Sequence, residues 1–428
     1  MKDWITRLLP FLKRWLGGLP LGSWLIGALV AGLLEHVFGA TLSYALWLHS
    51  LPAIFGLSVI LSEPTLIPSV VLYLLIMYFI PMYIVARLSA PFVRRVEQHF
   101  SPRVYIIVHL ILLYLVLQVW GTVDEYRLLV LRLLGVGIML TTSLNLVNGW
   151  MGEFSVAVAG FMSVGAYVSS VLMVWGFVND DVFGPAVLPP SLAPFAFPFV
   201  LIIGGLAAAI TALAVAIPSF RTRGDYLAII TLAYVFIVKS AVENIDYIGG
   251  PRGFMNQPPV ASFPVVFVWT VLALWTIYNY VSSTYGKATS AVRDNESAAE
   301  AMTVDTRRVK VIAFLTHAFW SGVAGGLYAH VIGYINPSSF GLVKSAEVLG
   351  MLYLGGLSSV TGSVFGTVLF QLLAEILRPL KLAKWLVIPV ILILVMVYRP
   401  RGLLGFREVQ FPFLTAKKKE VEHAPAGN

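Results

Sequence analysis

Long uninterrupted runs of hydrophobic residues follow one another along this chain, and short polar segments separate them. Runs near the length that a helix needs to cross a bilayer occur at about 66–86, 104–120, 126–147, 154–175, 198–217, 225–242, 264–282 and 311–332. One further crossing is expected within 21–62, a glycine-broken stretch follows at 346–378, and a last run lies at 385–398. The runs do not alternate in polarity, so helices rather than barrel strands are expected. The pattern predicts an all-α polytopic membrane protein of about 12 crossings, counting the broken stretch as two.

Composition agrees with this class. Hydrophobic residues make up 58% of the 428 residues and charged residues only 12%, whereas soluble chains carry about 25% charged residues. The chain has no cysteine, which excludes a disulfide framework and a thiolate metal site.

The net charge of +8 is best explained as a topology signal. Most basic residues lie in the N-terminus, in the loop around 87–103, at Arg221 and Arg223, at 287–310 and in the tail from Arg399. By the positive-inside rule all five places face the cytoplasm, with both termini inside, and no nucleic-acid surface is expected. Only Arg378, Lys381 and Lys384 fall on the outside in this arrangement.

Residues 1–20 are too polar to span. Apolar residues recur opposite basic ones at near-helical spacing, which predicts an interfacial amphipathic helix. Residues 406–428 form a basic tail, expected in the cytoplasm.

Two hydrophobic stretches contain polar residues and glycines at membrane depth. The first has Asn145, Gly149, Gly152 and Ser155, and the second has Gly355, Gly356 and Ser358. Irregular backbone at this depth is tolerated where protein or a water-filled cavity shelters it, and transporters use such discontinuous helices around solutes. Close helix packing through small residues is the other interpretation. A third glycine-rich segment, with Gly249, Gly250, Pro251 and Gly253, lies in an external loop that is either a shaped connector or a closure for a solute path or docking partner.

The loop 286–310 interrupts the hydrophobic pattern with a helix signal. Asp294 or Asn295 is a suitable N-cap, Ser297 and Glu300 form an alternative capping box, and alanines follow. A turn and a second helix from about Asp305 are expected to lead back into the membrane. Ala299 is expected on an exposed helix face. An ordered, smooth, short helix favours a docking surface for another protein over an ordinary solvated loop.

The sequence has no phosphate-binding glycine loop, no nucleophile elbow and no zinc motif. The ionisable residues in its hydrophobic runs, such as His317 and Glu347, form no evident proton relay. We therefore expect no catalysis by this chain, and an energy source elsewhere if transport is uphill.

Six segments, in this order, resemble the longer permease subunit of the branched-chain amino-acid ABC importer family. They are "RTRGDYLAIITLAY" (221–234), "GGPRG" (249–253), "AVRDNESAAEAMTVDTRRVKVIAF" (291–314), "INPSSF" (335–340), "LGGLSSVTGSVFG" and "YRPRGLLG" (398–405). The resemblance covers about residues 120–405 and leaves 21–119 as an N-terminal transmembrane extension. Three positions depart from the family: Ala157 and Val158 stand where it has Gly and His, and Thr303 replaces a glycine between the two helices of the coupling loop.

The resemblance implies an inner-membrane permease with a helical bundle of the ABC importer type. It implies a shorter partner permease, an external solute-binding protein and two cytoplasmic ATPases that carry ATP and Mg²⁺, with no cofactor on this chain. The coupling loop would then contact an ATPase through Arg293, Asn295, Glu296, Ala298, Ala299, Glu300, Ala301, Met302, Arg307 and Arg308. Family members that transport urea or short amides share the fold. The resemblance therefore does not decide whether the solute is an amino acid or a short amide. An ion-coupled secondary transporter is the alternative from a different class.

Overall fold

A computed structural model describes residues 19–48, 51–99, 101–180, 182–220, 226–399 and 402–405. The amphipathic helix expected over 1–20, apart from Leu19 and Pro20, lies outside these residues. So do Arg221, Arg223 and the tail 406–428.

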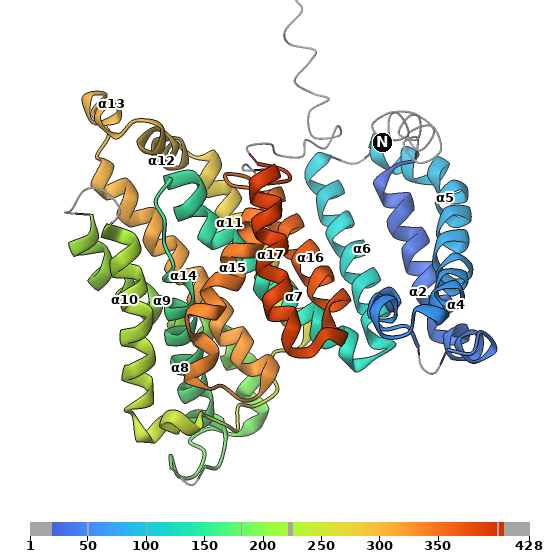
Figure 1. Cartoon of the computed structure of the whole chain (residues 1–428), viewed down its shortest axis with the longest axis horizontal. Coiled ribbons are helices and arrows are strands. Elements are labelled where there is room, and N and C mark those ends of the chain that lie inside the picture. Colours follow the sequence, from blue (N-terminus) through green and yellow to red (C-terminus); the bar gives the residue numbers. More distant parts are fainter. Residues whose placement is uncertain are drawn as a thin grey trace, which may run out of the picture. The chain divides into compact units, whose positions relative to one another are not determined.

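The predicted all-α membrane fold is confirmed over the described residues (Figure 1). Nine helices there are long and apolar enough to cross a bilayer: Leu21–Ala45, Pro64–Glu97, Val104–Thr122, Glu125–Met151, Val158–Phe177, Pro190–Ser219, Tyr226–Glu243, Phe263–Ser282 and Thr306–Ile332. The one crossing that the sequence placed somewhere within 21–62 is therefore the helix Leu21–Ala45. The glycine-broken stretch is a bent pair, Pro337–Gly355 and Val360–Ile376, at 118° to each other, and Leu386–Tyr398 is a shorter apolar helix.

The chain divides into two compact units. Unit 1 comprises residues up to Leu131 together with 375–380, and unit 2 comprises 132–374 together with 381–409. Unit 1 contains α2 (Leu21–Ala45), η1 (Ala53–Gly56), α3 (Val59–Ser62), η2 (Pro64–Leu66), α4 (Ile67–Leu74), the π-helical η3 (Leu75–Phe79), α5 (Ile80–His99), α6 (Pro102–Thr122) and the start of α7 (Glu125–Asn145).

Unit 2 contains the rest of α7 and the π-helical turn η4 (Leu146–Met151) that continues it. Its other long elements are α8 (Val158–Phe177), α9 (Ala193–Ser219), α10 (Tyr226–Glu243), α11 (Phe263–Ser282), α12 (Thr284–Asp294), α14 (Thr306–Ile332), α15 (Leu342–Gly355), α16 (Val360–Ile376) and α17 (Lys384–Tyr398). Its short elements are η5 (Pro190–Leu192), η6 (Asp246–Ile248), η7 (Gly250–Arg252), α13 (Glu296–Ala301), η8 (Pro337–Phe340) and η9 (Arg378–Ala383), the last of which begins in unit 1.

The core of unit 2 is built around α14, which packs against α8 and α9. The approach is close because glycines face each other: a Cβ on Gly165 would overlap the backbone of Gly322. Helices in a bilayer associate through such close packing, since lipid is as apolar as their side chains. This close packing holds α8 and α14 firmly against each other behind the site described below.

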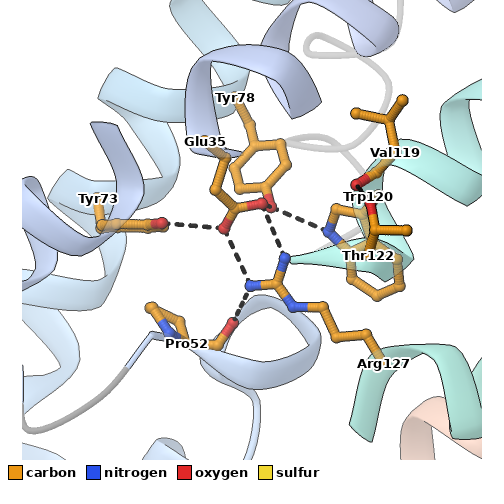
Figure 2. Close-up of polar contacts among 8 residues, drawn as sticks. All are labelled: Glu35, Pro52, Tyr73, Tyr78, Val119, Trp120, Thr122 and Arg127. Carbon is orange, nitrogen blue, oxygen red and sulfur yellow. Dashed lines mark hydrogen bonds and ion pairs between the residues drawn. The ribbon is translucent and has the colours of Figure 1, made fainter. Parts of the chain in front are cut away.

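Unit 1 is organised around a buried ion pair (Figure 2). Both guanidinium Nη atoms of Arg127 donate to the two carboxylate oxygens of Glu35, at 2.8 and 2.9 Å, and both side chains are almost fully buried. Tyr73 and Tyr78 also donate to this carboxylate, and Trp120 Nε1 donates to the Tyr78 hydroxyl at 2.9 Å. A second bond, from Arg127 Nη2 to the Pro52 carbonyl at 2.8 Å, leaves both charges well compensated in an apolar setting.

Candidate functional site

The loop between α12 and α14 forms the expected short helix. Asn295 caps α13 by accepting a hydrogen bond from Ala298 N at 3.0 Å. Asp305 caps α14 by accepting from Arg308 N at 3.0 Å. The two caps fix where the chain leaves and re-enters the bundle. Figure 1 shows α12 and α13 at one end of the unit 2 helices.

Glu300 does not act through Ser297 as the capping box predicted. Its carboxylate accepts a hydrogen bond from Thr306 Oγ1 at 3.1 Å and so joins α13 to the first residue of α14. The turn between them passes through Thr303 at φ +66°, a left-handed conformation that is strained for a β-branched residue. A glycine adopts this conformation readily, because it has no Cβ.

The exposed face of α13 differs from the one predicted. Ala299 is only 5% exposed, so its prediction as an exposed contact residue was wrong. The chain turns back at this point, and Met302 N and Val304 N both donate to the Ala299 carbonyl. Met302 is 77% exposed. The other exposed members of the predicted set are Asn295, Glu296, Ala298, Glu300, Ala301, Arg307 and Arg308.

Arg293, assigned from sequence to the docking surface, points into the protein instead. Its Nη1 donates to Ser358 Oγ at 2.8 Å and lies 3.5 Å from the carbonyl oxygen of Gly149. The remaining guanidinium nitrogens bond the carboxylate of Asp294 at 2.8 and 2.9 Å. Its aliphatic stem lies against Gly152 (φ +76°), where a Cβ would collide with Arg293 Cγ. The structure thus joins two residue groups that the sequence placed in separate sites.

Lys310, in the first turn of α14, makes a second connection to the same segment. Its ammonium lies 2.9 Å from a carboxylate oxygen of Glu153 and 2.9 Å from one of Glu296. Glu296 is the first residue of α13, and Glu153 follows the π-helical turn η4. One cation therefore bridges the short helix and the broken end of α7.

Asn145 holds the break between α15 and α16. Its Oδ1 accepts from Ser358 N at 3.0 Å, while Nδ2 donates to Ser359 O at 3.0 Å and to Ser363 Oγ at 2.7 Å. Gly149, one turn later, has no room for a Cβ because Asn145 Oδ1 and Ser358 N occupy that space. Ser358 itself has φ +54°. The amide side chain of Asn145 thus replaces the backbone partners that the interrupted helices lack.

The Gly355–Gly356 break is covered by the end of the described chain. Leu403 N and Leu404 N donate to the carbonyls of Leu354 and Gly355, at 3.2 and 2.9 Å. A Cβ on Gly356 (φ +122°) would lie against Gly405. The "LGGLSSV" and "YRPRGLLG" motifs are therefore two halves of one structural element.

Ser155 is fully buried and exchanges backbone hydrogen bonds with the side chain of Asn148. Asn145 is equally buried. In this conformation their polar groups are satisfied inside the chain, so close packing accounts for them. A role in the solute pathway stays a prediction.

The glycine-rich segment 249–253 lies beside two other loops. Phe254 and Ile335 exchange backbone hydrogen bonds at 2.8 and 3.0 Å, which pairs the "GGPRG" and "INPSSF" motifs. Gly249, Gly250 and Gly253 all have positive φ, and Pro251 lies between them in η7. Asn256 Nδ2 donates to Asp180 Oδ2 at 3.1 Å, and this bond holds the pKa of the Asp180 carboxyl below its usual value. These contacts brace the segment, and its role in closing a solute path or contacting a partner stays a prediction.

The sequence assigned no site role to Lys310, Ser359 or Ser363, and it marked Asn148 and Glu153 only as polar residues within the first irregular stretch. A lysine and a glutamate at the ends of hydrophobic runs are ordinary interfacial residues. Only the fold shows that they meet. Among the described residues no group of three His, Cys, Asp or Glu side chains is placed to hold a metal ion.

Comparison with known proteins agrees with this architecture. The model of the family "branched-chain amino acid transport system / permease component" matches residues 126–397. The high-affinity branched-chain amino acid transport system permease protein LivM of Escherichia coli K12 is 29% identical over 326 residues, covering 68% of this chain and 71% of that protein. A probable branched-chain amino acid transport permease protein LivM of Methanocaldococcus jannaschii is 22% identical over 336 residues, covering 68% and 97%. The permease protein LivH of Escherichia coli K12 is 30% identical over 150 residues, covering 34% and 48%. No solved structure matches.

The fold and the matches define a multi-pass membrane permease with discontinuous helices. This chain belongs to the branched-chain amino-acid transport permease family.

Proposed function

We propose that this chain is one of two permease subunits of an ATP-driven importer for branched-chain amino acids and forms half of its translocation pathway. The observation that carries the proposal is the short capped helix α13, exposed between α12 and α14 and lying within the matched region. Met302 and the exposed residues beside it give this helix an accessible side for a partner. A helix of six residues is too short to be stable alone and is typical of a contact element.

The partners follow from the relatives. LivM and LivH are both named as permeases of a high-affinity branched-chain amino acid transport system. We propose a shorter permease as the second membrane subunit, two ATPases on the side of α13, and a solute-binding protein on the side of the 249–253 segment. In this arrangement α13 faces the cytoplasm, both termini are cytoplasmic, and the protein lies in the inner membrane.

ATP and Mg²⁺ belong to the ATPases in this proposal, and the chain itself is a non-catalytic subunit. The motive is the lack of a phosphate-cradling glycine loop in the sequence. Purified chain that hydrolyses ATP by itself contradicts this assignment.

The test is reconstitution of the four kinds of subunit in liposomes. Labelled leucine is expected to accumulate only with ATP, and omission of the ATPases or of this chain is expected to abolish uptake. A membrane potential or proton gradient without ATP is expected to drive none, and uptake driven in that way identifies a secondary transporter. Competition by urea or acetamide, without competition by isoleucine or valine, places the chain among permeases for short amides.

A further inference from the structure

We infer that Arg293 and Lys310 are positioning residues that transmit movement of α13 to the broken helices of unit 2. The inference rests on the proposed function, because it assigns the route by which a docked ATPase acts on the membrane bundle. It goes beyond docking, since neither residue presents its charge to a partner.

The two residues flank α13 on opposite sides and reach the same segment. Arg293 leaves the last turn of α12 and contacts Gly149 and Gly152. Lys310 leaves the first turn of α14 and contacts Glu153. The short helix is thus connected twice to residues 149–153, the turn and exit at the end of α7.

The contacts of Arg293 with Gly152 and Ser358 suit an arginine side chain specifically. Gly152 leaves room for the stem of Arg293, and Ser358 presents its hydroxyl to the guanidinium from a backbone with φ +54°. Arg293 is 23% exposed, so water does not fully screen this charge-assisted bond. Arginine can bond Ser358 and Asp294 together because its donors point in several fixed directions, whereas lysine has a single nitrogen.

The second connection links α13 itself. The ammonium of Lys310 is 10% exposed and lies between Glu296 of α13 and Glu153. A displacement of α13 moves Glu296 and, through the shared cation, acts on Glu153.

From residues 149–153 the contacts continue to the second break. Gly149 packs against Asn145 and Ser358, and Asn145 binds Ser358, Ser359 and Ser363 at the α15–α16 junction. Discontinuous helices are the part of a transporter that rearranges around a solute. The contacts therefore form one continuous polar route from the docking helix to both breaks.

The experiment uses the complete importer in liposomes and measures leucine taken up per ATP hydrolysed. Arg293→Ala is expected to lower this ratio about tenfold while the ATPase subunits still co-purify with the membrane subunits. Ser358→Gly removes the hydroxyl without disturbing a positive φ and is expected to act in the same direction. If Arg293 works through Ser358, the ratio of leucine taken up to ATP hydrolysed is no lower in the double variant than in Arg293→Ala alone.

Arg293→Lys and Lys310→Arg keep the charge and separate coupling from general stability. Arg293→Lys is expected to recover only part of the ratio, since it loses one of two simultaneous bonds. Lys310→Met is expected to lower the ratio, and Lys310→Arg to restore it. Lys239→Ala is the control. It removes a part-exposed cation whose ion pair with Glu243 lies within α10, so no change in the ratio is expected.

The outcomes distinguish failure of the transmission route from failure of the proposed function. An Arg293→Ala importer with the wild-type ratio overturns the transmission route and leaves the proposed function intact. Multiplicative effects of Arg293→Ala and Ser358→Gly overturn the contact between them as the route. A wild-type assembly that takes up no solute with ATP overturns the proposed function, and the inference with it.

Discussion

Arg293 and Ser358 are joined by a 2.8 Å hydrogen bond across 65 positions of the sequence. The contact connects the loop that carries α13 to the break between α15 and α16. Both residues belong to motifs singled out in the sequence, "AVRDNESAAEAM" and "LGGLSSV", and the bond brings these two motifs together in space. The loop that carries α13 and the irregular membrane segments are therefore parts of one structural site.

Met302 is expected to contribute to binding of an ATPase. It is 77% exposed at the end of α13, and an exposed apolar side chain that fills a central, desolvated pocket of a partner is one of the few interface residues whose truncation costs more than about 1 kcal/mol. Met302→Ala is expected to reduce co-purification of the ATPase without changing the thermal midpoint of the isolated chain.

The matched comparison for Met302 is Ala299, which is buried. Ala299→Arg overfills a packed contact within the chain itself, at a cost of about 1–3 kcal/mol. The thermal midpoint of the Ala299→Arg chain is therefore expected to fall together with its ATPase binding. Full ATPase binding by Met302→Ala contradicts the docking assignment of α13.

Replacing Thr303 with glycine is expected to stabilise the turn after α13. A residue with a Cβ pays about 1–2 kcal/mol in the left-handed conformation that Thr303 adopts. Hydrogen exchange at the Val304 amide, which bonds the Ala299 carbonyl, is expected to slow. Ser297→Gly lies in the helical part of α13 and is expected to act in the opposite direction, by about 0.5 kcal/mol. Faster exchange in Thr303→Gly than in wild type contradicts the strain.

Asn145→Ala is expected to destabilise unit 2 markedly. It strands the Ser358 N–H and deprives Ser359 O and Ser363 Oγ of a donor, and an unsatisfied buried polar group costs about 1–3 kcal/mol. Thermal unfolding of the purified chain measures the loss. Ser155→Ala is the control: its hydroxyl accepts one 3.3 Å bond, from Ala157 N, and a loss below about 1 kcal/mol is expected. Equal losses for the two variants contradict the bracing role of Asn145.

The Glu35–Arg127 pair of Figure 2 gives a prediction for unit 1. Removal of one partner from a buried ion pair costs about 3–5 kcal/mol, because a buried charge loses its counter-ion. Glu35→Gln and Arg127→Met are each expected to cause such a loss in thermal unfolding. The double variant is expected to lose less than either one, since a neutral amide still accepts bonds from Tyr73 and Tyr78. A double variant whose loss equals the sum contradicts the pairing.

The sequence by itself determined the class of this protein, its helical spans and the helix–turn–helix of the coupling loop. These features depend on local quantities: the length of an apolar run decides whether it spans, and caps such as Asn295 and Asp305 act on amides three residues away.

Tertiary structure alone decided which residues share the site. Arg293 was assigned to the surface and Asn145 to a cavity because each was judged by its own segment. The fold brings 145–153, 293–310 and 358–363 together and satisfies their polar groups with one another. Ala299 is buried for the same reason, because its exposure depends on how the chain turns back after α13. Contacts between distant segments depend on how the helices pack. The polarity of one segment therefore does not predict which other segment it will contact.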